Sequence, residues 1–91
     1  MYTIQVKPAF ERSFDKLTKR DRPLAIRLRN VIEGLRSDPR PDGCNKLAGV
    51  KEGGEDVYRI RAGDFRVLYV IRDRALIVLL VDVLDRKDAY R

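Results

Sequence analysis

Four arginines fall within the stretch Val57 to Arg72, where apolar and charged residues alternate as they do in β-strands. They are Arg59, Arg61, Arg66 and Arg72. A guanidinium group stays charged and can bind a phosphate through two parallel hydrogen bonds. If several of these side chains share one side of a sheet, they could bind a nucleic-acid backbone or stabilise charge that develops on a phosphate.

The turn Gly63-Asp64 decides whether the arginines share a side. A two-residue hairpin loop, which glycine favours, places Arg61 directly opposite Arg66. Residues that face each other across a hairpin point to the same side, and Arg59 joins them because it lies two residues from Arg61. Like charges in these positions repel each other, and strands 57–62 and 65–71 contain no carboxylate. The alternative is a solvated face on which each arginine covers apolar surface with its stem.

The N-terminal part of the chain predicts a strand and two helices that would support such a sheet. Tyr2, Ile4 and Val6 alternate with polar residues and predict the strand. Pro8 favours the start of the first helix, and Asp21 is expected to cap the second. The apolar positions of the two helices recur at helical spacing. They are Phe10, Phe14, Leu17, Leu24, Leu28, Val31, Ile32 and Leu35.

Three further strands are predicted at 57–62, 65–71 and 75–84, and residues 37–43 and 52–55 are expected to be loops. The resulting order, β-α-α-β-β-β, predicts an α+β fold formed by a single domain over residues 1–91. The helical hairpin would pack on one face of a small, mostly antiparallel sheet. The other face would be a concavity lined partly by arginine.

Composition narrows the classes of function. Lys plus Arg number 20 and Asp plus Glu 14, so the formal net charge of +6 suits an acidic partner. The chain has no histidine and one cysteine, Cys44, so it lacks the usual general base and the ligands of a zinc site. We therefore expect no metal and no cofactor. The apolar run 75–81 is too short to span a membrane, and with no secretion signal and a lone cysteine we expect a cytoplasmic protein.

Several segments resemble the RelE/ParE toxin superfamily, and its RelE branch most closely. The likeness lies in the motifs NKLAG at 45–49 and YRIRAGDFRVLY at 58–69, the apolar strand 75–83, and the tail 86–90. It implies a toxin of a type II toxin–antitoxin pair that cleaves messenger RNA in the ribosomal A site without a metal. In that reaction the ribose 2′-OH attacks its own 3′-phosphate and leaves a 2′,3′-cyclic phosphate and a 5′-OH.

The resemblance also implies roles for individual residues. Arg59 and Arg61 would surround the 2′-OH and the phosphate, and Arg66 would clamp the phosphate. Arg86 would stabilise the transition state or protonate the leaving group, and Tyr90 would stack on the RNA or orient it. For Tyr90 the alternative is simple packing of the C-terminal tail.

Two further positions carry competing interpretations. Lys46 matches a basic loop residue that would contact RNA, although a solvated loop residue is the simpler explanation. Arg59 and Arg61 replace the lysines of the best-known member, and arginine cannot give up its proton. The general base is therefore open, and Asp85 is a tentative choice. Its alternative role is to end the last strand and pair with Arg86.

The resemblance implies partners as well: the 70S ribosome with its messenger RNA, and an acidic, helical, RelB-like antitoxin that suppresses the toxin's inhibition of translation and growth. The alternative within the superfamily is a ParE-like inhibitor of DNA gyrase without nuclease activity. Arg86 and Tyr90 distinguish the two, because only the nuclease needs them. A third hypothesis is a basic module that binds RNA or DNA without chemistry.

Overall fold

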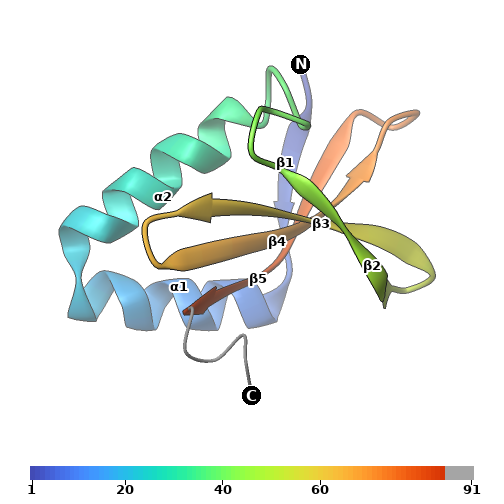
Figure 1. Cartoon of the computed structure of the whole chain (residues 1–91). Coiled ribbons are helices and arrows are strands. Elements are labelled where there is room, and N and C mark those ends of the chain that lie inside the picture. The colour runs from blue at the N-terminus through green and yellow to red at the C-terminus, as the bar shows by residue number, and fades with distance from the viewer. Residues whose placement is uncertain (86–91) are drawn as a thin grey trace.

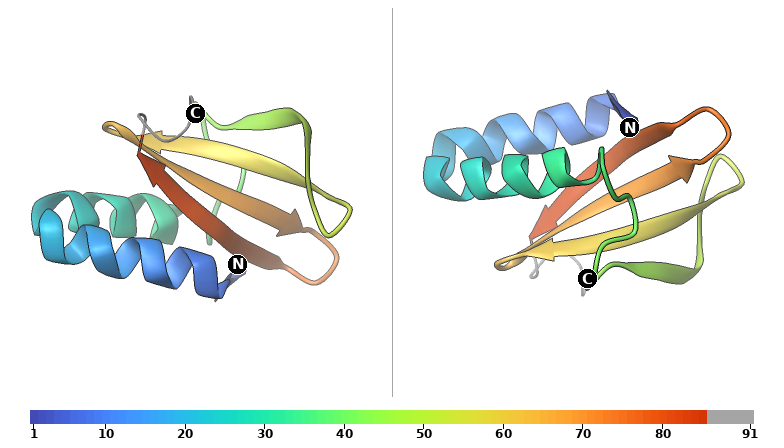
Figure 2. Two further views of the ribbon diagram at one scale, coloured as in Figure 1. Left: turned by 90° about the horizontal axis from the view of Figure 1, so that it is seen from below. Right: turned by 90° about the horizontal axis from the view of Figure 1, so that it is seen from above.

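The computed structural model describes residues 1–85, in which two helices cover one face of a five-stranded sheet (Figures 1 and 2). The predicted α+β class, with a helical hairpin on a mostly antiparallel sheet, is confirmed. The helices are α1 (Pro8–Arg20) and α2 (Arg22–Gly34). The strands are β1 (Thr3–Val6), β2 (Asn45–Glu52), β3 (Glu55–Ala62), β4 (Phe65–Arg72) and β5 (Ile77–Asp85).

The helices begin where local chemistry favours them. Pro8 occupies the first turn of α1, where its missing N–H costs nothing. The Asp21 carboxylate accepts a hydrogen bond from the Leu24 N–H at 3.2 Å, which confirms it as the cap of α2. Leu17 and Leu28 are buried, at 2% and 0% exposure, because the apolar faces of both helices turn toward the sheet.

The sheet has the order β1-β5-β4-β3-β2, with β1 parallel to β5 and every other pair antiparallel. In the β3–β4 hairpin Arg61 lies opposite Arg66 and Ala62 opposite Phe65, as a two-residue loop requires. Gly63 in that loop has a φ of +61°, a conformation that glycine adopts without strain.

The expected order β-α-α-β-β-β omitted one strand, and β2 is the correction. Most side chains of β2 are exposed, so no apolar alternation identifies it in the sequence. Its pairing with β3 is also interrupted: the residues between Lys46 and Lys51 oppose only Val57, which lies between Asp56 and Tyr58. We call residues 47–50 the β2 bulge. A strand of this kind is detected by its partner and not by its own pattern.

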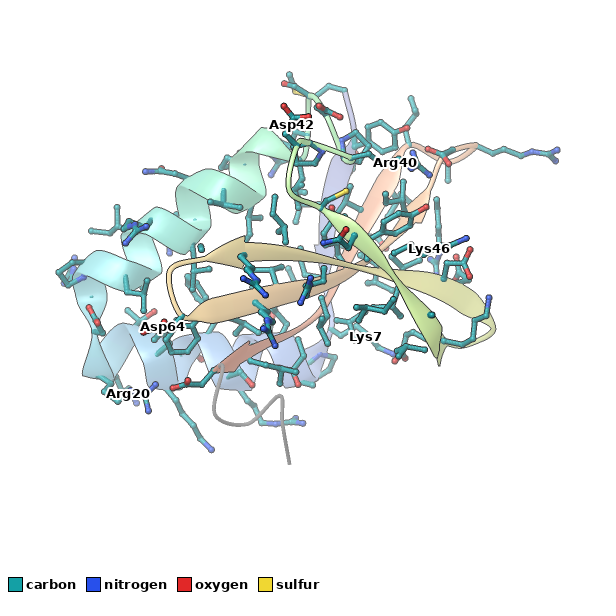
Figure 3. The ribbon with its side chains drawn as sticks, in the orientation of Figure 1. Lys7, Arg20, Arg40, Asp42, Lys46 and Asp64 are labelled. Carbon is teal, nitrogen blue, oxygen red and sulfur yellow. The ribbon has the colours of Figure 1, made fainter. Side chains whose placement is uncertain are left out.

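The sheet curls on the face that the helices leave uncovered. β1 and β2 are its two edges, yet Lys7, directly after β1, forms an ion pair with Glu52 at the end of β2 (Figure 3). The uncovered face is therefore concave. On it, Val57 and Val70 are only 2% and 1% exposed.

Candidate nucleic-acid interface

Three arginines share the concave face of the sheet. The register places Arg61 opposite Arg66, and Arg59 opposite Leu68. Because alternate residues of a strand point to opposite sides, Arg59 and Arg61 lie on one side and Ile60, which is buried against the helices, lies on the other. The register confirms the prediction that the three arginines share one side of the sheet. We call Arg59, Arg61 and Arg66 the arginine face.

The arginine face has features that suit an anion. Arg66 is largely buried, at 8% exposure. The Nε of Arg59 is buried and has no hydrogen-bond partner within residues 1–85. An unsatisfied buried donor costs about 1–3 kcal/mol, so an oxygen that bound it would be favoured. A cavity of about 100 Å³ lies at the hairpin end, lined by Arg61, Gly63, Asp64 and Arg66.

Two other arginines, Arg40 and Arg72, are already paired with carboxylates. Arg72 bonds the Glu55 carboxylate through Nε and Nη2, at 3.1 and 2.8 Å. Arg40 binds Asp73 through two bonds of 3.1 and 2.9 Å and lies over the Tyr58 ring, 5.3 Å from its centroid. Of the four arginines in 57–72, Arg72 therefore has a structural role, whereas Arg59 and Arg61 form no ion pair with the described residues.

The Arg40–Asp73 pair predicts a specific response to acid. Hydrogen bonds from Arg40 and Tyr2 lower the pKa of Asp73 to about 2. A lowered pKa in the folded state means that the contribution to stability is complete above the ordinary value near 3.8 and is lost as the pH falls toward 2. For the wild type, we expect the urea concentration at the midpoint of unfolding to decrease as the pH is lowered from about 5 to about 2.

The Asp73→Asn variant should show a shallower fall over the same range, because the amide does not titrate. Asp15→Asn is a suitable control, since Asp15 is exposed on α1 and forms no ion pair within residues 1–85. The assignment of this titration to Asp73 would be wrong if both variants kept the slope of the wild type.

The structure separates two other predicted site residues from the arginine face. Lys46 lies in β2, not in a loop. It is opposite Tyr58, and its Nζ is 3.8 Å from Oδ2 of Asp56, on the other side of the sheet. Asp85 lies opposite Phe65, whose ring is in the core beneath the helices, and its Oδ2 is 3.8 Å from Nη2 of Arg20. Arg86 and Tyr90 lie outside the described residues.

Two residues near the arginine face were missed in the sequence. Asn45 lies directly opposite Arg59, and Asp64 lines the cavity beside Arg61 and Arg66. Asn45 could not be placed without β2, whereas the position of Asp64 in the hairpin loop was a usable signal. Within residues 1–85 there is no group of His, Cys, Asp or Glu suited to a metal ion. None of the helices in this part is long and apolar enough to cross a membrane.

Comparison with known proteins gives a consistent family. The sequence model of the ParE toxin of type II toxin–antitoxin systems (parDE) matches residues 4–90. The chain is 32% identical over 65 residues to RelE1 of Methanocaldococcus jannaschii, a protein named as a toxin, and the match covers 71% of each chain.

Solved structures show the same fold. A chain of the RelE–RelB complex of Pyrococcus horikoshii has a TM-score of 0.76 and 22% identity, over 93% of this chain and 94% of that one. A chain of the Escherichia coli RelBE complex has a TM-score of 0.75 and 21% identity, over 93% of this chain and 96% of that one. A chain of the RelBE2 complex of Mycobacterium tuberculosis has a TM-score of 0.65 and 26% identity, over 93% of this chain and 98% of that one. The chain belongs to the RelE/ParE superfamily of toxins from toxin–antitoxin systems.

Proposed function

We propose that this toxin is a ribosome-dependent endoribonuclease that cleaves messenger RNA in the A site and so inhibits translation and growth in the cytoplasm. The observation that carries the proposal is the arginine face, where the Arg59 Nε is buried without a partner in residues 1–85. Fixed cationic donors are what an RNA phosphate requires as negative charge builds up in the transition state.

The reaction requires that the protein position the RNA and stabilise the negative charge that develops on the phosphate. The 2′-oxygen forms a bond to the adjacent phosphorus as the bond from phosphorus to the 5′-oxygen breaks. The 2′-OH loses its proton, and the leaving 5′-oxygen gains one. Arg59, Arg61 and Arg66 would bind the phosphate and hold the RNA in line for attack. Arg86 is proposed for the leaving group and Tyr90 for stacking on the RNA. The nucleophile belongs to the substrate, so the proposed reaction needs no metal.

An antitoxin partner is part of the proposal. The similar structures from Pyrococcus horikoshii and Escherichia coli are complexes of RelE with RelB. With a net charge of +6, this chain would attract an acidic, helical, RelB-like segment that covers the arginine face and prevents RNA binding.

Asp85 is not expected to be the general base, because the sheet lies between it and the arginine face. We predict that Asp85→Asn cleaves RNA within about threefold of the wild-type rate, since the loss of a true general base costs about a hundredfold or more. Cleavage rates of the purified variant in a translating extract would measure this. A loss of a hundredfold in a variant of wild-type stability would restore Asp85 as the base.

The proposal is tested by adding purified protein to a translating extract, with and without a chelator, and mapping the 5′ ends of the messenger RNA. Cuts in register with codons, dependent on ribosomes and unaffected by the chelator, are expected. The alternative is a ParE-like gyrase inhibitor, which the match to the ParE model over residues 4–90 favours. Inhibition of DNA supercoiling without RNA cuts would establish that function instead.

A further inference from the structure

We propose that the Lys7–Glu52 ion pair is a clasp that closes one end of the concave face and limits the length of single-stranded RNA that can lie there. The limit on RNA rests on the proposed function, whereas the clasp itself does not. The two residues are 45 positions apart and belong to opposite edges of the sheet. No sequence pattern connects them.

The geometry places the clasp on the same side as the arginine face. Glu52 lies opposite Glu55 at the start of β3, and Glu55 shares its side with Arg59 because the two are four residues apart on one strand. Lys7 follows β1, and three strands lie between β1 and β2 in the sheet, yet Lys7 reaches the Glu52 carboxylate. The ion pair therefore spans the concave face and does not lie along one edge.

Two buried valines show what the clasp covers. Val57 and Val70 are 2% and 1% exposed, yet they are not part of the core cluster that packs against the helices. Alternation along β3 and β4 puts Val57 on the side of Arg59, and Val70 on the side of Arg66. The helices cover the opposite side, so we assign the cover of the two valines to the β2 bulge and the Lys7–Glu52 pair.

The concave face thus has a closed end and an open end. Val57 and Val70 lie at the closed end, and Arg61 is exposed beside the cavity at the hairpin end. An RNA strand that enters from the hairpin end meets Arg61 and Arg66 first and then Arg59. We expect it to stop before the valines, because their side chains are already covered at 2% and 1% exposure. Binding affinity should therefore stop rising once the RNA fills the open end.

The test uses Lys7→Glu, Glu52→Lys and the double variant that reverses the pair. The single changes shift the net charge in opposite directions but both break the clasp, so an effect common to both cannot come from net charge. The probes are 2′-O-methyl RNA oligonucleotides of increasing length, which lack the attacking hydroxyl and report binding without cleavage. The dissociation constant is measured at each length.

We expect the wild-type affinity to reach a plateau at a short length. Both single variants should continue to gain affinity severalfold with longer RNA, and the double variant should return to the early plateau. Lys51→Glu is the matched control, because Lys51 is the neighbour of Glu52 and pairs with Asp56 on the other side of the sheet. It should keep the plateau of the wild type.

A second measurement examines the clasp without RNA. The methyl resonances of Val57 and Val70 should broaden with a soluble paramagnetic agent in each single variant, but not in the wild type or the double variant. Unchanged methyl protection in both single variants would overturn the clasp. Changed protection with an unchanged plateau would overturn its limit on RNA length. If no form binds RNA, the proposed function and the limit fail together, and the methyl measurement still decides the clasp.

Discussion

Arg61→Ala is expected to abolish growth arrest and to lower RNA cleavage by about a hundred- to a thousandfold, the usual cost of one lost donor to a charged transition state. The same change should not destabilise the protein. Arg61 is exposed, has no ion pair within residues 1–85, and lies directly opposite Arg66. Removing one of two like charges across a strand pair should stabilise the hairpin by about 0.2–1 kcal/mol.

The two effects are measured together, by mapping 5′ ends in a translating extract and by urea unfolding of the same preparation. Arg74→Ala is the matched control, since Arg74 is exposed in the turn between β4 and β5, at the other end of β4 from Arg61. It should keep both cleavage and stability. Wild-type cleavage by Arg61→Ala would contradict a catalytic role for Arg61, and unfolding of the variant would contradict the expected gain in stability.

Arg61→Lys separates charge from geometry. Lysine keeps the positive charge but cannot form the two parallel hydrogen bonds of a guanidinium group. We expect a cleavage rate between those of the wild type and Arg61→Ala. A rate equal to that of the wild type would mean that Arg61 acts through its charge alone.

The position of the arginine face could be predicted because it depends on local rules. A two-residue loop and the alternation of side chains fix Arg61 against Arg66 and bring Arg59 to the same side. The helices were predictable for a similar reason, since their apolar residues recur at a spacing that only a helix places on one face.

What could not be predicted depends on partners that are distant in the sequence. β2 has mostly exposed side chains and is held by its pairing with β3, so its own residues do not reveal it. The side on which Asp85 lies depends on a register shift between β4 and β5, near Leu68 and Tyr69. One extra residue in a strand moves every side chain beyond it to the opposite face of the sheet, and no local sequence pattern indicates that shift.

The core and the arginine face lie on opposite sides of the same strands, so stability and catalysis should be separable by mutation. Leu28→Ala tests this separation by changing a residue of the core. Leu28 is 0% exposed in α2 and belongs to the cluster beneath the helices. Its truncation should cost about 2–5 kcal/mol. A domain of this size is stable by only about 5–15 kcal/mol, so the variant should unfold at much lower temperature.

The prediction for Leu28→Ala is therefore the reverse of that for Arg61→Ala. Growth arrest should weaken at high temperature because less of the protein is folded. At low temperature, where the variant is folded, the cleavage rate per folded molecule should match that of the wild type. Ile26→Ala is the control on the same helix, because Ile26 is 54% exposed and its truncation should change stability by no more than about 0.5 kcal/mol. A low cleavage rate in fully folded Leu28→Ala would show that the helical layer acts on the arginine face through the sheet.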